Sequence, residues 1–160
     1  MDGQTPNPLP TPPRGLYPAR VDDKGRLKLP AVFKAFLEQR GEKEVFVTSF
    51  DGRIARIYTP SVWQETEEFL IRDGEDFEVR EQMYYDAMRY GADSRLDEQG
   101  RILINTDLRR EMGIENQPVR LMFYRGVIQF WSEAVDAEKR AAASQISAAA
   151  RKEQEKKGLR

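Results

Sequence analysis

Short stretches of alternating apolar and polar residues mark two parts of the chain, residues 19–29 and 94–104. In the first stretch Val21, Leu27 and Leu29 fall on one face, and the charged residues between them fall on the other. Alternation with a period of two is typical of strands that are buried on one side only. The pattern therefore predicts a β-hairpin in each stretch, with a glycine-containing turn between its two strands.

The two stretches are copies of one motif, Asp-x-x-Gly-Arg, which occupies residues 22–26 and recurs at residues 97–101, an offset of 75. Gly25 and Gly100 supply the left-handed backbone conformation that such a turn requires, because glycine has no Cβ. The similarity continues for several residues beyond each motif. An internal repeat of this kind predicts one supersecondary unit used twice, with pseudo-twofold symmetry within the chain.

A short amphipathic helix is predicted after each motif. The first helix covers residues 30–41, and its apolar stripe consists of Val32, Phe33, Phe36 and Leu37. The second helix covers residues 105–113, with Leu108 and Met112 facing inward and Gly113 ending it. Both helices place apolar side chains where they can cover a small sheet.

A further hairpin follows each of these helices, at residues 45–58 and 119–131. Between the two copies, the sequence Ser61-Val62-Trp63-Gln64 predicts a capping-box start for one helix, and residues 77–90 predict a second. The expected buried residues of these connecting helices are Val62, Trp63, Phe69 and Leu70 in the first and Phe77, Met83, Tyr84, Ala87 and Met88 in the second. From Ser132 onward the chain is Ala-rich and has high helix propensity.

Composition excludes many kinds of enzyme. The chain has 160 residues with no cysteine and no histidine, so disulfides, thiolate nucleophiles, histidine-based triads and most zinc sites are ruled out. Apolar runs stay well short of the roughly 18 residues of a membrane span. We therefore expect no cofactor, no metal, no membrane association and no small-molecule substrate.

Charge is unevenly distributed although the formal net charge is only −1. Residues 14–60 carry 10 basic and 6 acidic side chains, whereas residues 61–94 carry 3 and 10. Residues 95–131 carry 6 and 5, and residues 132–160 carry 7 and 5. A basic binding face therefore requires that the acidic middle of the chain points elsewhere.

The two motifs, each followed by an apolar strand and a short helix, resemble the MraZ family. The resemblance covers about residues 16–135 and includes the Leu29-Pro30 continuation and a strand ending at Trp131. It implies an α+β fold of the AbrB-like class, a double-split or swapped-hairpin β-barrel built from two pseudo-symmetric repeats with short connecting helices. The expected segments are a disordered Pro-rich leader (1–15), the first repeat (16–60), connecting helices (61–92), the second repeat (93–135) and an Ala-rich helical or disordered tail (136–160).

The same resemblance implies a DNA-binding transcriptional regulator in the cytoplasm, associated with the nucleoid. It would repress the promoter of the division and cell-wall gene cluster, its own operon, by reading repeated boxes of double-stranded DNA. The resemblance to this family also implies assembly into ring-shaped homo-oligomers. Its DNA-contacting positions correspond to Arg26 and Arg101 in this sequence.

Arginine on an exposed hairpin can bind guanine O6 and N7 or a phosphate, and a two-stranded ribbon fits the major groove. Asp22 and Asp97 would pre-orient these arginines, while Gly25 and Gly100 supply the turn geometry. By their position on the same face, the candidate phosphate contacts are Arg20, Lys24, Lys28 and Arg95. A second interpretation treats Asp22 and Arg26 as a structural cross-strand ion pair, and the two interpretations are compatible.

Two other functions compete with this one. The first is an AbrB-like antitoxin or protein-interaction module whose C-terminal tail binds a protein partner. The second is an enzyme using the carboxylates of residues 65–81, but these are spread along helices that we expect to face solvent. Neither a nucleophile–base pair nor a phosphate-binding glycine loop occurs in the sequence.

Overall fold

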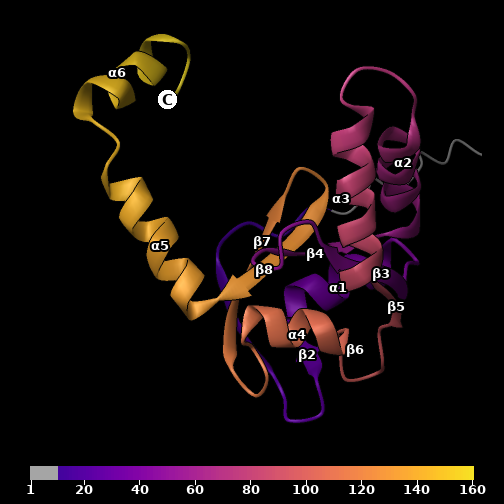
Figure 1. Ribbon diagram of the computed structural model, residues 1–160. Coiled ribbons are helices and arrows are strands. Elements are labelled where there is room, and N and C mark those ends of the chain that lie inside the picture. Colours follow the sequence, from indigo (N-terminus) through magenta and orange to yellow (C-terminus); the bar gives the residue numbers. More distant parts are fainter. Residues whose placement is uncertain (1–10) are drawn as a thin grey trace, which may run out of the picture.

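A computed structural model describes residues 11–160 of the chain. In this part the chain forms eight strands and six helices (Figure 1). The strands are β1 (Tyr17–Val21), β2 (Arg26–Lys28), β3 (Glu44–Ser49), β4 (Ala55–Tyr58), β5 (Ala92–Arg95), β6 (Arg101–Leu103), β7 (Pro118–Tyr124) and β8 (Val127–Ser132). The helices are α1 (Ala31–Gln39), α2 (Pro60–Ile71), α3 (Phe77–Tyr90), α4 (Thr106–Met112), α5 (Glu133–Ser144) and α6 (Ala148–Lys156). Most of the predicted leader, its first ten residues, lies outside the described residues.

All eight strands belong to one antiparallel sheet with the order β5-β3-β4-β8-β7-β1-β2-β6. The two end strands, β5 and β6, come together where the N–H of Leu103 donates to Oγ of Ser94 at 3.0 Å. The sheet therefore curls into a nearly closed barrel. This confirms the predicted α+β barrel.

The two repeats exchange hairpins across a pseudo-twofold axis. Strand β2 pairs with β6, and Leu27 faces its repeat equivalent Ile102 at the centre of this pairing. The N–H of Leu29 donates to the carbonyl of Gly100 at 2.8 Å, and the N–H of Ile104 donates to the carbonyl of Gly25 at 3.0 Å. Each repeat thus completes the hydrogen bonding of the other, as a swapped-hairpin fold requires.

The core forms where the inward positions of both repeats meet. Alternation along the strands directs Val21, Leu27, Leu96 and Ile102 inward, and each is at most 4% exposed. Helix α1 adds Phe33, Phe36 and Leu37, and α4 adds Leu108, all of them buried.

Several expected burials are wrong, one on α1 and three on the α2–α3 hairpin. Val32 of α1 is 43% exposed because the stripe that faces the sheet is narrower than predicted. Phe69, Met83 and Met88 are also exposed because α2 and α3 pack against each other and against β3, which leaves their outer surfaces uncovered.

The predicted capping box at Ser61 is also wrong. Helix α2 begins at Pro60 with Thr59 as the N-cap residue, two positions before the predicted cap. Proline suits this first helical position because it has no N–H that would need a partner. Ser61 is therefore already inside the helix.

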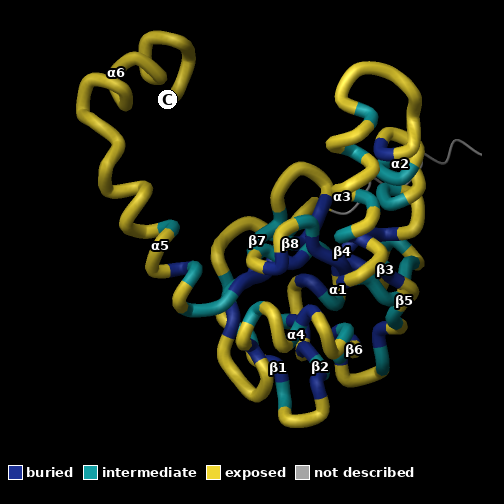
Figure 2. The backbone as a smooth tube through the Cα atoms, in the orientation of Figure 1, coloured by how far each residue is buried: buried dark blue, intermediate teal, exposed yellow. Residues whose placement is uncertain are grey.

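The helices that follow the two repeats are arranged differently. Helices α2 and α3 fold back as a hairpin beside β3, whereas α5 and α6 extend away from the barrel (Figures 1 and 2). Helix α6 contains no buried residue. Among residues 11–160, none of the helices combines the length and apolar character needed to cross a membrane.

Candidate nucleic-acid interface

Asp22 organises the turn of the first motif through both oxygens of its side chain. Oδ1 accepts the backbone N–H groups of Lys24 and Arg26, each at 2.9 Å. The backbone closes the same turn, because the N–H of Asp22 donates to the carbonyl of Arg26 at 2.8 Å and the N–H of Gly25 donates to the carbonyl of Asp22 at 3.1 Å. Gly25 adopts a φ of +81°. The spacing of the motif therefore suits a turn in which the aspartate side chain accepts the N–H groups two and four residues further along the chain.

The second oxygen of Asp22 holds the arginine that ends the motif. Nε of Arg26 donates to Oδ2 of Asp22 at 2.9 Å, and the arginine side chain is 30% exposed. Because the carboxylate takes only the Nε edge of the guanidinium, the terminal nitrogens of Arg26 keep their donors for an external acceptor. Two parallel donors of this kind match O6 and N7 of guanine or two phosphate oxygens.

The second motif repeats this arrangement with the same atoms. Oδ1 of Asp97 accepts the N–H groups of Gln99 and Arg101 at 3.0 and 2.8 Å, and Oδ2 accepts Nε of Arg101 at 2.9 Å. One terminal nitrogen of Arg101 also donates to Oε1 of Gln99 at 3.2 Å. Gly100 has a φ of +79°, close to that of Gly25.

Both aspartates are held in the ionised form. Burial alone would raise the pKa of Asp22, but hydrogen bonds from the backbone and side chain of Arg26 and from the backbone of Lys24 lower it below its ordinary value. For Asp97 the backbone hydrogen bond from Arg101 is the main cause of a lowered pKa, and it outweighs the effect of burial. The ion pair predicted from the sequence therefore exists in both copies.

The pairing of β2 with β6 brings the two arginines onto one surface. Arg26 faces Leu103 across the strands, and Lys28 faces Arg101. Their neighbours Leu27 and Ile102 point into the core, so these four side chains point outward. We call this surface the β2–β6 face, and its residues are Arg26, Lys28, Arg101 and Leu103.

The β2–β6 face is basic apart from one apolar side chain. Leu103, the repeat equivalent of Lys28, is 56% exposed at its edge. The acidic helices α2 and α3 lie at the other end of the molecule, beside β3 (Figure 1). The acidic middle of the chain therefore points away from the β2–β6 face. This meets the condition that the uneven charge of the sequence sets for a basic binding face.

Two of the other predicted phosphate contacts adjoin this face. Arg20 pairs with Lys28 in the β1–β2 ladder, and its guanidinium donates to the backbone carbonyl of Asn116 at 2.8 Å. Lys24 lies at the exposed tip of the first turn. Whether these side chains contact phosphate stays a prediction.

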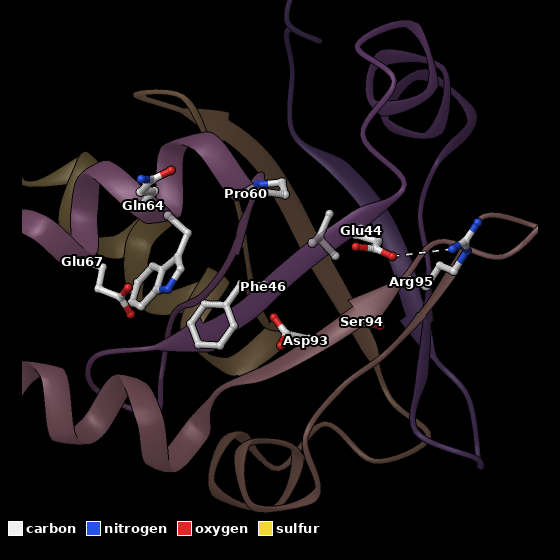
Figure 3. Close-up of a pocket in the computed structure, with 10 residues that line it drawn as sticks. Glu44, Phe46, Pro60, Gln64, Glu67, Asp93, Ser94 and Arg95 are labelled. Carbon is white, nitrogen blue, oxygen red and sulfur yellow. Dashed lines mark ion pairs between the residues drawn. The ribbon is translucent and has the colours of Figure 1, made fainter.

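Arg95 occupies the position in β5 that Arg20 occupies in β1, but its surroundings differ. Its side chain is 71% exposed and pairs with Glu44 at 3.5 Å. The pair lies at the rim of a groove of about 500 Å³, where Trp63 packs on Phe46 with ring centroids 4.4 Å apart (Figure 3). The guanidinium of Arg95 is therefore paired with a carboxylate, whereas that of Arg20 donates to an uncharged carbonyl.

Sequence reasoning missed two cations that cross over to the opposite motif. The guanidinium of Arg109 lies where a Cβ on Gly25 would be, and Cδ of Lys34 would lie 3.1 Å from a Cβ on Gly100. A Cβ on Gly25 would therefore displace the Arg109 guanidinium, and a Cβ on Gly100 would push the Lys34 side chain aside slightly, in addition to the cost of the positive φ. The signal was present in the sequence, because Lys34 and Arg109 are themselves separated by the repeat offset of 75.

Nothing in the described part of the chain resembles a metal site. Across residues 11–160 no group of three carboxylates is arranged to hold a metal ion. The candidate interface consists of two arginines, each clamped by an ionised aspartate, with Lys28 beside them on one face. The terminal N–H groups of these arginines suit recognition of an anionic polymer.

The fold and these two turns define a class, the swapped-hairpin β-barrels with an arginine displayed by each of two hairpins. A scan against models of protein families found no match. Among curated proteins, the transcriptional regulator MraZ of Acidobacterium capsulatum is 35% identical over 106 residues, which are 66% of this chain and 73% of that protein. The MraZ regulator of Koribacter versatilis is 34% identical over 116 residues, 72% of this chain and 79% of the relative. That of Lachnoclostridium phytofermentans is 34% identical over 123 residues, 74% and 80% of the two chains.

The chain belongs to the MraZ family. The resemblance seen in the two motifs thus extends over 66–74% of the chain when it is aligned with curated members of the family.

Proposed function

We propose that this protein is a sequence-specific DNA-binding transcriptional regulator whose two motif hairpins read double-stranded DNA. The observation that carries the proposal is the pair of arginines, Arg26 and Arg101, clamped by aspartate at Nε and placed on one exposed face. Relatives that match most of the chain are named transcriptional regulators, which supports the same conclusion.

Each residue of the interface has a proposed role. Asp22 and Asp97 fix the arginine side chains before binding, so less conformational entropy is lost when the complex forms. Lys28 lies opposite Arg101 and two residues along β2 from Arg26. Its proposed role is a phosphate contact. Arg20, Lys24 and Arg95 add further phosphate contacts at the periphery, and the protein acts without a cofactor.

A single chain offers few contacts, so assembly is part of the proposal. Several copies arranged in a ring present many hairpins to repeated DNA boxes, and the effective concentration of the second and later hairpins raises the affinity. The proposed target is the promoter of the division and cell-wall gene cluster, which includes the protein's own operon, and the proposed effect is repression. The protein would then act in the cytoplasm at the nucleoid.

The test is fluorescence anisotropy with a labelled duplex from the protein's own upstream region and a scrambled duplex, over a series of salt concentrations. Wild type should prefer the upstream duplex, and its affinity should fall as salt rises because bound counterions are released. Arg26→Ala/Arg101→Ala should weaken specific binding about a hundredfold or more, since each bidentate arginine contributes about 1–3 kcal/mol.

A matched control removes two positive charges elsewhere. Arg72 and Arg125 are exposed residues outside the β2–β6 face, so Arg72→Ala/Arg125→Ala should keep the preference for the upstream duplex. Equal affinity of wild type for both duplexes at low salt would refute the proposal. A melting temperature lowered in step with the binding loss would instead identify the two arginines as structural.

A further inference from the structure

The C-terminal arm, residues 133–160, is attached to the barrel by the first turns of α5, and every residue from 140 to 160 is exposed. Helix α6 has no buried residue, and in α5 only Asp136 is buried. Within the arm, Ser147 caps α6 and the guanidinium of Arg151 donates to the carbonyl of Ala143 at 3.1 Å. A nine-residue helix is marginal in water on its own, so this arm gains stability when another surface covers it.

The first turns of α5 fix the direction of the arm. Nε1 of Trp131 donates to Oδ1 of the buried Asp136 at 3.0 Å, and Lys139 lies over the Trp131 ring, 4.5 Å from its centroid. Arg53, in the loop before β4, pairs with Glu138. Because α5 is anchored on two sides, the arm points away from its own barrel (Figure 1). It can reach a second molecule but not the α2–α3 hairpin of its own chain.

The α2–α3 hairpin carries six of the twelve large apolar side chains that are exposed in the described part of the chain. Its apolar side chains are between 37% and 64% exposed, and they are Phe69, Ile71, Val79, Met83, Tyr85 and Met88. Solvent-facing apolar side chains gathered on one element are typical of an interaction surface. The same hairpin is acidic, since residues 60–91 carry nine carboxylates and three arginines.

The arm has the complementary composition. Residues 147–160 carry five basic and two acidic side chains, and the arm exposes Ile146 and Leu159 among alanine-rich helical turns. Alanine faces allow close approach of another helix. DNA would match the basic residues but would offer no helical apolar surface to the alanines and to Ile146.

We propose that the C-terminal arm of one molecule docks on the acidic outer surface of the α2–α3 hairpin of a second copy. The proposal rests on the self-assembly included in the proposed function and names the surfaces that build it. A basic, alanine-rich helix then covers the exposed apolar side chains of the neighbouring hairpin, and the rim charges of opposite sign set the orientation. The contact is head-to-tail, so it can be repeated around a closed ring.

Cross-linking tests the contact directly, because the natural chain contains no cysteine. One chain carries Ala149→Cys in α6 and a second, differently tagged chain carries Gln82→Cys on the exposed side of α3. After mixing and treatment with a short bis-maleimide, the product should join the two different tags. The control pair, Ala149→Cys with Arg125→Cys at the β7–β8 turn, should give at least about tenfold less product. Equal yields from the two pairs would overturn the proposal.

A charge swap provides the second test, read by analytical ultracentrifugation of the full chain. Reversing the arm (Arg151→Glu/Lys152→Glu/Lys156→Glu) or the hairpin (Glu75→Lys/Glu78→Lys/Glu81→Lys) should weaken self-association about tenfold, and combining the two reversals should restore it. If wild type sediments as a monomer, self-assembly itself fails, while DNA recognition is judged by the anisotropy test. If wild type assembles and neither reversal changes its sedimentation, only the arm contact fails. An arm reversal that weakens DNA binding without changing sedimentation would assign the arm to DNA and overturn the proposal.

Discussion

The turn at residues 22–26 and the turn at residues 97–101 share one set of hydrogen bonds: an aspartate accepts two backbone N–H groups with one oxygen and an arginine Nε with the other. Their surroundings are not the same. The first turn connects two strands that pair as a ladder, β1 and β2. After the second turn, the N–H of Leu103 is taken by the hydroxyl of Ser94, whose repeat equivalent is Ala19.

The comparison separates what the motif does from what its neighbours do. The Asp-x-x-Gly-Arg residues close the turn and hold the arginine by themselves, because every hydrogen bond involved lies within the motif. The differences lie one or two residues outside it, where Lys28 is replaced by Leu103 and Arg95 has a carboxylate partner. We infer that the two hairpins present equally positioned arginines on unequally charged surfaces.

The largest expected effect concerns the two arginines taken singly. Arg26→Ala and Arg101→Ala should each weaken binding to the upstream duplex by roughly tenfold to a hundredfold, since each removes about 1–3 kcal/mol of readout. We expect the larger loss for Arg26, because its own hairpin also carries Arg20 and Lys28, whereas the hairpin of Arg101 carries Leu103 and an Arg95 that is paired with Glu44. Anisotropy titrations of the two single variants check this. Equal losses would show that the surroundings of the turns do not matter.

The next largest effect concerns the motif glycines. Gly25→Ala and Gly100→Ala should each lower the free energy of unfolding by about 1–2 kcal/mol because of their positive φ, and Gly25→Ala should lower it further because the new Cβ must displace Arg109. Urea denaturation measures the differences. Gly113→Ala is the matched control, since Gly113 also has a positive φ but open space around its Cβ position. If Gly25→Ala lowers the free energy of unfolding no more than Gly113→Ala does, the position of Arg109 over Gly25 is unimportant for stability.

A smaller effect is expected from exchanging the one residue that breaks the symmetry of the β2–β6 face. Leu103→Lys should steepen the salt dependence of DNA binding by about one counterion, and Lys28→Leu should flatten it by the same amount. Both positions are exposed, so the free energy of unfolding should change by less than about 0.5 kcal/mol. The slope of log affinity against log salt is the readout. Unchanged slopes in both variants would place this edge of the face outside the DNA contact.

The smallest effect is a dependence of stability on pH. The lowered pKa values of Asp22 and Asp97 stabilise the folded state above about pH 4, and this contribution is lost as pH falls through the folded-state values. Melting curves between pH 7 and pH 3 should therefore fall less steeply for Asp22→Asn/Asp97→Asn than for wild type. The pKa of Asp51 is lowered as well, so some acid dependence should remain in the variant. Parallel curves would mean that folding does not lower the pKa values of Asp22 and Asp97.

Much of the fold could be predicted from the sequence because its signals are local or repeated. The turn at Gly25, the inward positions of Leu27 and Ile102 and the range of α3 depend on periodicity and on backbone preference. Because the motif occurs twice, the sequence also predicts two hairpins that present the same kind of binding surface. The exposure of Val32 could not be predicted, because a helical stripe indicates which residues can be buried but not how wide a surface will cover them.

The sequence by itself determined the two aspartate-clamped arginine turns, since all of their hydrogen bonds join residues at most four positions apart. Only the tertiary structure decided that β2 pairs with β6, which places both arginines on one face, and that Lys34 and Arg109 each cover the glycine of the opposite motif. It also decided that α2–α3 folds back while the C-terminal arm extends. These contacts join residues 66 to 84 positions apart, or depend on which surfaces remain uncovered. No local pattern of polar and apolar residues encodes that choice.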